Sequence, residues 1–181
     1  MKKLILIIGI VGAFSMLTIN VCAQAASNQD LTMGIPEVCL LGTDGVAVSL
    51  ELTTTTAGAQ ITGGTGTSYA QVSSIVSAEE LRTITAAITG IPAGTSLSVN
   101  TAIPSNGSQG GILGTGTSDI ALVNADPAVT LVTAIGSCYT GTASTDGYVL
   151  DYTWDCAVGT YGNIVATGGV TATLVLTITN Q

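Results

Sequence analysis

The sequence VTATLVLTIT at residues 170–179 alternates apolar side chains with threonine or valine. Successive side chains of a β-strand point to opposite faces of a sheet, so this period of two predicts one face on a core and one in water. Threonine on the outer face is a good strand former that stays soluble without charge. The same alternation recurs at residues 46–53 and 83–89, and it predicts a β-rich protein.

Further strands are expected along the rest of the chain, separated by turn signals of glycine, proline, asparagine and aspartate. We place them at residues 31–41, 69–76, 97–102, 120–123, 129–135 and 148–154. Residues 63–66 are interpreted as a turn, 107–116 as a surface loop and 77–80 as one helical turn. Many short strands at this spacing predict an all-β fold, an immunoglobulin-like antiparallel β-sandwich of about seven to nine strands.

The first residues have the pattern of a secretory signal peptide. Lys2 and Lys3 precede an apolar run at residues 4–17, and residues 21–25 hold two overlapping small-x-small cleavage patterns. A membrane-spanning helix is the alternative interpretation. The stretch 4–21 is near the lower length limit for such a helix, and no basic stop follows it.

We therefore expect a cleaved signal helix at residues 1–25 and a single β-sandwich domain at residues 26–181. Val21 is a poor match for the small residue that precedes a lipidated cysteine, so we expect Cys22 to leave with the signal. Export places the mature chain outside the cytoplasm, in a bacterial periplasm, at the cell surface or in the extracellular space.

The charge of the mature chain limits its partners. With Lys2 and Lys3 removed, Arg82 is the one cation against eleven acidic residues, a formal charge of 1 − 11 = −10. Nucleic acid is excluded because its affinity for proteins depends on neutralised phosphates, and an anionic membrane surface is excluded likewise. We expect no membrane insertion of the mature chain, since only 4% of the residues are aromatic.

The chain lacks the residues on which most enzymatic mechanisms depend. The chain has no histidine, which removes the commonest general base and zinc ligand, and the mature chain has no lysine for Schiff-base or serine–lysine chemistry. We therefore predict a protein that is not an enzyme, without catalytic, cofactor-binding or metal-ligating residues. Calcium stays open as a weaker alternative because five aspartates lie in the C-terminal half: Asp119, Asp126, Asp146, Asp151 and Asp155.

Three cysteines remain after signal cleavage, namely Cys39, Cys138 and Cys156. An odd number in an oxidising compartment allows at most one disulfide within the chain. A simple hairpin with its turn at residues 140–147 would place Cys156 roughly 23 Å beyond the partner position of Cys138. A disulfide needs Cα atoms within about 7 Å, so Cys39 is the expected partner of one of the two. Three buried free thiols are the alternative.

An aromatic cluster offers a second candidate site. Tyr148, Tyr152 and Trp154 share one parity and line one face of a predicted strand near Asp151 and Asp155. Such a stripe either packs in the core or forms an exposed binding platform of the kind that glycan-binding sandwiches use. Its exposure distinguishes the two interpretations.

The C-terminal segment resembles the last strand of chaperone–usher pilins, including the spore-coat-U-like branch. Gly168 stands fourteenth from the C-terminus and an alternating apolar run follows it to Ile178. The resemblance implies that an N-terminal alternating segment, here Leu31, Met33 and Ile35, inserts into a neighbouring subunit as a donor strand. Asn180 departs from the family pattern, which has a penultimate tyrosine. About nine strand signals also exceed the six strands of an incomplete pilin fold.

These observations lead to two functional hypotheses. The first is a non-enzymatic structural or adhesive protein outside the cytoplasm, a pilin-like fibre subunit that associates with itself, because the mature chain has no lysine to protect sheet edges and its last strand is uncharged. The second is a sandwich module that binds a surface glycan or another surface protein.

The signal interpretation predicts the mature N-terminus. Cleavage after Ala23 or Ala25 leaves a chain that begins at Gln24 or Ala26, which mass spectrometry of the exported protein will identify. A mature protein that keeps Met1, or that carries lipid on Cys22, contradicts the interpretation.

Overall fold

The computed structural model describes residues 28–54, 56–78, 80–124, 127–157 and 159–181. The predicted signal peptide at 1–25 lies outside the described residues. The chain divides into a first unit that ends at Gly34 and a compact second unit, Ile35–Gln181, which contains every strand of the described part. No helix in these ranges is long and apolar enough to span a membrane.

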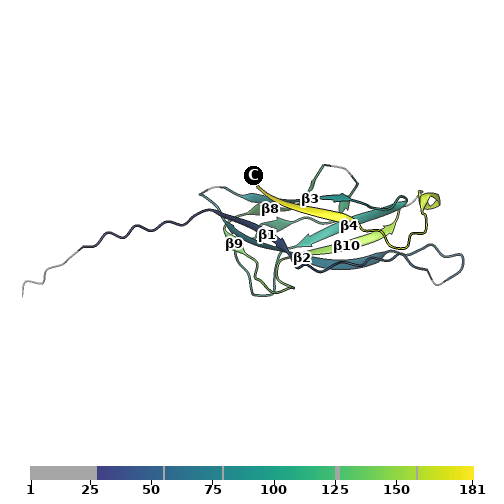
Figure 1. The fold of residues 1–181 in the computed structure, drawn as a ribbon, viewed down its shortest axis with the longest axis horizontal. Coiled ribbons are helices and arrows are strands. Elements are labelled where there is room, and N and C mark those ends of the chain that lie inside the picture. The colour runs from purple at the N-terminus through teal and green to yellow at the C-terminus, as the bar shows by residue number, and fades with distance from the viewer. Residues whose placement is uncertain (1–27, 55, 79, 125–126, 158) are drawn as a thin grey trace, which may run out of the picture. The chain divides into compact units, whose positions relative to one another are not determined.

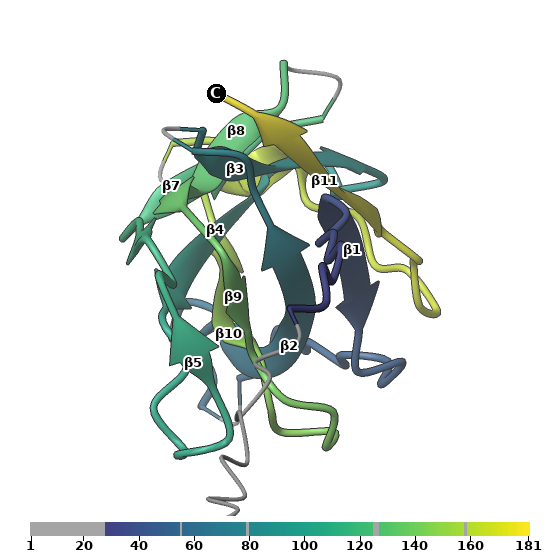
Figure 2. The same cartoon turned by 90° about the vertical axis from the view of Figure 1, so that its left-hand side faces the viewer.

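The second unit consists of two antiparallel sheets that pack face to face (Figure 1, Figure 2). Its longer strands are β1 (Val38–Thr43), β2 (Gly64–Ile75), β3 (Arg82–Thr89), β4 (Thr95–Ala102), β8 (Val129–Ile135), β10 (Tyr148–Cys156) and β11 (Thr173–Asn180). The short strands are β5 (Gly110–Gly111), β6 (Thr115–Gly116), β7 (Ile120–Leu122) and β9 (Cys138–Tyr139). The predicted all-β sandwich is confirmed, whereas the immunoglobulin-like connectivity stays a prediction.

The larger sheet is built around β2. β1 pairs with one edge of β2, while β9 and β10 pair with the other edge. β4 follows β10, β7 follows β4, and β5 pairs with β9. The smaller sheet has the order β11-β3-β8-β6. In the described part of the chain, β1 and β11 therefore each have a paired edge and an unpaired edge.

The core lies between the sheets, where the alternation of the strands directs their apolar side chains. Every second residue of β3 is buried, as the sequence pattern at 83–89 predicts. The deepest side chains are Leu131, Val132 and Ile135 of β8 and Tyr148 of β10, each without solvent exposure. Burial of apolar surface is the main stabilising contribution in such a sandwich.

One predicted strand, residues 46–53, is wrong, and Asp44 explains why. The β1–β2 ladder runs to the pair Thr43 and Ala70, after which the backbone N–H of Asp44 still donates to the Tyr69 carbonyl. The next ladder partner is missing because the Asp44 carboxylate itself accepts the N–H of Tyr69 at 3.2 Å. The chain then turns, and only Thr53 forms a further bridge, to Thr62.

Two glycine-rich segments that were expected to be a turn and a loop contain strand residues. β2 begins at Gly64, where we expected a turn. A surface loop was expected at residues 107–116, but residues 110–117 pass from the larger sheet, where β5 pairs with β9, to the smaller sheet, where β6 pairs with β8. Glycine suits this segment because the segment passes close to the backbone of other strands.

The crossing segment, residues 110–117, closes one side of the sandwich. Thr101 of β4 donates its N–H to the Thr117 carbonyl at 2.8 Å, and Thr117 donates its own N–H to the Leu131 carbonyl of β8 at 2.9 Å. A backbone hydrogen-bond chain thus joins the two sheets. Gly116 lies so close to β4 that an added Cβ atom would be 2.0 Å from the Thr101 carbonyl oxygen.

The simple hairpin considered for the disulfide, with its turn at residues 140–147, does not form between β9 and β10. Both strands are antiparallel to β2 on the same edge, so they run in the same direction and follow one another along β2. Residues 140–147 form an excursion between them. The buried Asp146 carboxylate holds the excursion, because it accepts the N–H of Ala143 at 2.8 Å and is hydrogen bonded to the Asn106 side-chain amide.

The close approach of Gly116 to β4 gives a test of the closed side. Gly116→Ala places a methyl group against a backbone carbonyl that cannot rotate away, so we expect a loss of about 3 kcal/mol in the free energy of unfolding. Gly42→Ala is the matched control, since no atom lies within 4 Å of the Cβ position there. Urea unfolding measures both. Equal stability of the two variants would contradict the described closure.

Candidate functional site

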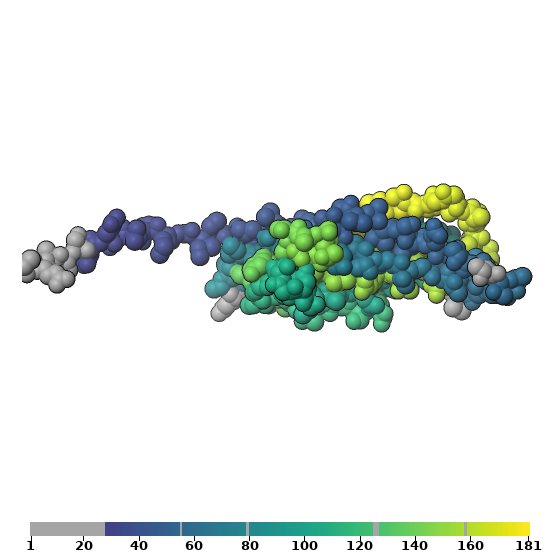
Figure 3. All heavy atoms as spheres, turned by 90° about the horizontal axis from the view of Figure 1, so that it is seen from below, coloured from purple at the N-terminus to yellow at the C-terminus, as the bar shows by residue number. Residues whose placement is uncertain are grey.

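The side of the sandwich opposite the crossing segment is open. The edge strands β1 and β11 belong to different sheets and lie near one another (Figure 2, Figure 3). In the described part of the chain, β1 pairs with β2 alone and β11 with β3 alone. We call this side the open seam, defined by β1, residues 44–50 and β11.

Half-buried apolar side chains line the open seam. They pack against the core cluster but keep part of their surface in solvent. β11 contributes Leu174, Leu176 and Ile178, and the first part of the second unit contributes Leu41, Val48 and Leu50. The alternation of β11, which its sequence predicts, thus produces a core face that the described chain leaves incompletely covered.

Neither edge strand at the seam carries a charged residue. Soluble sheets usually guard their edges with lysine, proline, bulges or inward charges. The two edge strands have none of these charges, and the polar groups of β11 are mainly threonine hydroxyls. A long, uncharged edge of this kind favours pairing with another strand.

The predicted donor residues lie just before β1 in the sequence. Leu31, Met33 and Ile35 are exposed, with 76%, 89% and 82% of their surface accessible. Residues 28–37 form no strand in the described structure. Large apolar side chains in water at every second position are unusual for a soluble segment, and they give this stretch the pattern of an unpaired strand.

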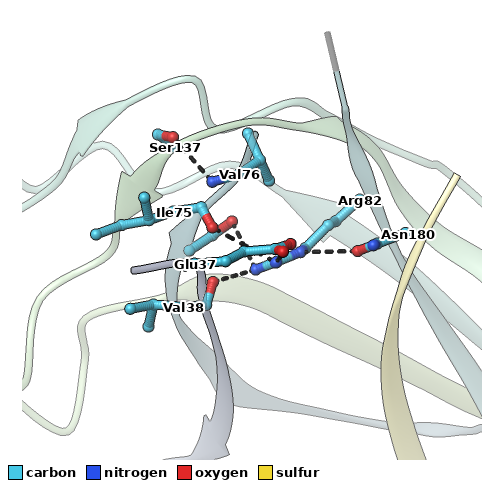
Figure 4. A network of polar contacts seen from close by, with 8 residues as sticks. Glu37, Val38, Ile75, Val76, Arg82, Ser137 and Asn180 are labelled. Atoms are coloured by element: carbon cyan, nitrogen blue, oxygen red, sulfur yellow. Dashed lines mark hydrogen bonds and ion pairs between the residues drawn. The ribbon is translucent and has the colours of Figure 1, made fainter. Parts of the chain in front are cut away.

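One guanidinium closes an end of the open seam (Figure 4). Arg82, at the start of β3, is only 2% exposed. Its Nε donates to the Asn180 side chain at 3.1 Å, and its Nη2 contacts the Glu37 carboxylate at 2.5 Å. It also donates to the carbonyls of Val38 and Ile75 and to the Ser74 hydroxyl. We call this network the Arg82 clasp.

The Arg82 clasp is a feature that reasoning from the sequence missed, because Arg82 entered there only through the net charge. One indication was available, since a single cation at the head of an alternating strand shares its face with apolar residues. A buried arginine needs several acceptors. The sequence does not indicate which distant residues supply them.

The three cysteines that follow the predicted signal are free thiols in the structure. Cys39 and Cys138 are both level with Ser74 of β2, but on opposite sides of that strand. Strands in a sheet are about 4.8 Å apart, so the two lie roughly 10 Å apart, beyond disulfide range. The expected bond of Cys39 is therefore absent, and unlike the alternative of three buried thiols, Cys39 is exposed.

Cys156 is distant from both. The residue pairs Trp154 with Gly64 and Cys138 with Ser74 place Trp154 roughly 33 Å along β2 from Cys138, and Cys156 lies two residues further on. Burial raises the pKa of the Cys138 thiol, partly offset by the Tyr148 hydroxyl and the Arg82 charge. A raised pKa lowers the thiolate population, so Cys138 is a poor nucleophile.

The aromatic stripe belongs to the core. Tyr148 is fully buried and donates its hydroxyl to the Leu113 carbonyl at 2.6 Å, while Tyr152 is 8% exposed and hydrogen bonded to Ser68. Trp154 is half-buried and packs against the same cluster. These positions support the core interpretation of the stripe and leave little aromatic surface for a binding platform.

The aspartates do not converge on one point. Asp151 accepts the Thr67 hydroxyl at 2.6 Å, Asp155 accepts the N–H of Cys156 at 2.7 Å, and Asp146 is bonded within the excursion at residues 140–147. Asp126 lies outside the described residues. Within the described ranges, no three acidic, cysteine or histidine side chains form a group suited to a metal ion.

A shallow depression of about 380 Å³ lies between two loops at one end of the second unit. Its lining consists of Gly58, Ala59, Gln60, Ala157, Gly159 and Tyr161. Tyr161 is the aromatic member of this lining and is 44% exposed. The depression thus combines an aromatic face with an amide, without a charged side chain among these lining residues.

Comparison with protein-family models, with curated proteins and with solved structures finds no match to this chain. Inference about function therefore depends on the geometry of the described residues. The open seam and, separately, the exposed segment 28–36 are the two features in which alternating apolar side chains are left partly or fully in solvent.

The buried tyrosines predict sensitivity to alkali. Burial, together with the nearby Cys138, raises the pKa of Tyr148 above its ordinary value of 10.0, and burial raises that of Tyr152. The unfolded chain releases the tyrosine protons at a lower pH than the folded chain. The contribution of these tyrosines to the free energy of unfolding is therefore fully present below about pH 10 and is lost as the pH rises above that value. Urea unfolding between pH 8 and pH 11 should show this fall.

Tyr148→Phe separates the two contributions of the hydroxyl. At neutral pH the variant loses about 1 kcal/mol with the hydrogen bond to Leu113. Above pH 10 its stability falls less steeply than that of the wild type, because one ionising group is gone. Tyr139→Phe, at a half-exposed tyrosine, is the control. A slope unchanged by Tyr148→Phe would contradict the assignment.

Proposed function

We propose that this protein is a non-enzymatic structural subunit outside the cytoplasm that assembles with copies of itself. In the proposed assembly, segment 28–36 of one copy pairs as an added strand in the open seam of another. The observation that carries the proposal is the coincidence, in one chain, of an open uncharged edge with half-buried apolar residues and an exposed alternating segment.

The two surfaces agree in spacing and chemistry. Leu174, Leu176 and Ile178 recur every second residue along β11, and the apolar residues of segment 28–36 have the same period. Strand addition of this kind takes affinity from main-chain hydrogen bonds and specificity from alternate side chains. Pro36, which has no N–H to donate, suits the end of a paired stretch.

Self-association explains why the exposed segment is tolerated. Three large apolar side chains in water reduce solubility unless they are covered. Burial of each contributes about 1.5–3 kcal/mol, enough for three to offset much of the ordering of a short segment. A copy of this chain is the occupant we favour because the segment is tethered to every copy that carries a seam.

The second candidate function is a module that binds a surface glycan or protein. The depression beside Tyr161 favours it, since sugar sites combine an aromatic face with amides. The stripe of Tyr148, Tyr152 and Trp154, which first suggested this function, is largely buried. A chain that stays monomeric would make the module the better proposal.

The assembly proposal predicts the effect of a charge in the donated segment. Met33→Asp places a carboxylate where the seam would be apolar, so assembly of the mature chain should weaken at least tenfold. Sedimentation velocity over a range of concentrations measures this. Val165→Asp is the matched control, because Val165 is 75% exposed and lies outside both proposed surfaces.

Deletion of residues 26–35 tests the same interaction from the other side. The deletion removes the donated strand and leaves the seam uncovered, so ordered assemblies should disappear and the shortened chain should aggregate. A peptide of residues 28–36 should restore its solubility, whereas the same peptide with Met33→Asp should not. A full mature chain that is monomeric at high concentration, with a melt independent of concentration, contradicts the proposal.

A further inference from the structure

We infer that Arg82 is a positioning residue that couples the two edges of the open seam, so that order at the start of β1 and order at the end of β11 rise and fall together. Its significance for assembly rests on the proposed function, in which one edge leads to the donated segment and the other receives it. The coupling itself is a property of the monomer.

The hydrogen-bond geometry carries this inference. A guanidinium has five N–H donors, and the clasp gives each of them an acceptor. Nη1 serves the Val38 carbonyl and the Ser74 hydroxyl, and Nη2 serves Glu37 and the Ile75 carbonyl. Nε serves Asn180, the last residue of β11. A single planar group therefore joins the start of β1, the end of β2 and the end of β11.

Burial of Arg82 makes every hydrogen bond of the Arg82 clasp necessary for stability. Arg82 is 2% exposed, whereas its ion partner Glu37 is 47% exposed. A buried charged group must keep its hydrogen-bond acceptors, because water does not replace an acceptor that moves away. Each lost acceptor leaves an N–H donor unsatisfied, which costs free energy. Movement of β1 away from the seam therefore removes acceptors from the same guanidinium that holds Asn180. Lysine would not replace it, having three donors and no planar fork.

No backbone hydrogen bond duplicates this link in the described part of the chain. β1 and β11 are not paired with each other, and they lie in different sheets. The backbone hydrogen bond from Gln181 to the Leu81 carbonyl ties β11 to β3, but it does not reach β1. The Arg82 clasp is thus the polar connection between β1, which follows the donated segment in the sequence, and β11, which receives a donated segment in the proposed assembly.

The consequence for assembly concerns both ends of the interaction. Strand addition along β11 orders that edge, and through Arg82 it also favours an ordered start of β1. A fixed start of β1 fixes the point at which segment 28–36 leaves the subunit. In the proposed assembly, a copy whose open seam is occupied would then have its own segment 28–36 restricted in direction when that segment is donated to another copy.

Hydrogen exchange of the full mature chain tests the coupling. Arg82→Met should accelerate exchange roughly tenfold or more for the amides of both β1 and the second half of β11, with a smaller effect in β10. Thr140→Val is the matched control, since it also removes a buried polar contact to β2, at Val72. It should affect β9 and its neighbours without affecting β11.

Glu37→Gln provides a milder variant in case Arg82→Met fails to fold. Arg82 is the one trypsin site of the predicted mature chain, so cleavage after it reports opening of the clasp. Glu37→Gln should accelerate cleavage roughly three- to tenfold, and the charge-matched control Glu51→Gln should not. Acceleration of β1 exchange without β11, or an equal acceleration throughout the core, would overturn the coupling.

A peptide of residues 28–36 distinguishes this inference from the proposed function, because it occupies the seam without ordering the segment that leads into β1. Added to the dilute mature chain, the peptide should slow exchange in both β11 and β1 of the wild type, and in β11 only of Arg82→Met. If the peptide does not slow exchange in β11, the proposed function fails, while the comparison of dilute monomers still decides the coupling. If the peptide slows exchange in β11 and Arg82→Met retains the β1 effect, the coupling fails.

Discussion

The buried charge of Arg82 is the constraint on which the arrangement of both sheets depends. A guanidinium removed from water needs all five donors satisfied, and here the acceptors come from β1, β2 and β11 and from Glu37. The two sheets must therefore meet in one register at this end. The sole cation of the predicted mature chain thus contributes to internal structure and is withdrawn from the surface.

The two sides of the sandwich differ in the contacts that join the sheets. On one side, Thr117 links β4 and β8 by backbone hydrogen bonds, and close backbone contact at Gly116 leaves no room for another strand. On the other side, the contacts between the sheets in the described part of the chain are made by side chains, and the apolar residues of β11 keep part of their surface in solvent. Residues 44–50 pass along this side without forming a strand.

The sequence predicts the strands well where one physical rule determines them. Alternation identified β3 and β11 because nothing competes with the period of two there. It failed at residues 46–53, where the Asp44 carboxylate takes the place of a backbone acceptor. The glycine content of residues 107–116 predicted a surface loop, but glycine there allows a close approach to the backbone of other strands. The clasp and the order of β9 and β10 along β2 depend on tertiary contacts, which no local pattern contains.

The composition of the chain also accounts for the uncharged edge strands of the open seam. Lysine on an edge strand prevents pairing because an ammonium resists burial between strands. The predicted mature chain has no lysine, and its acidic residues in the described part lie mostly in turns or on outer faces, as at Asp44 and Asp151. Threonine keeps the seam soluble, yet its hydroxyl does not prevent a ladder of backbone hydrogen bonds. In the proposed assembly, edges without charge would leave recognition of a second copy to the spacing of apolar side chains, a period of two that segment 28–36 and β11 share.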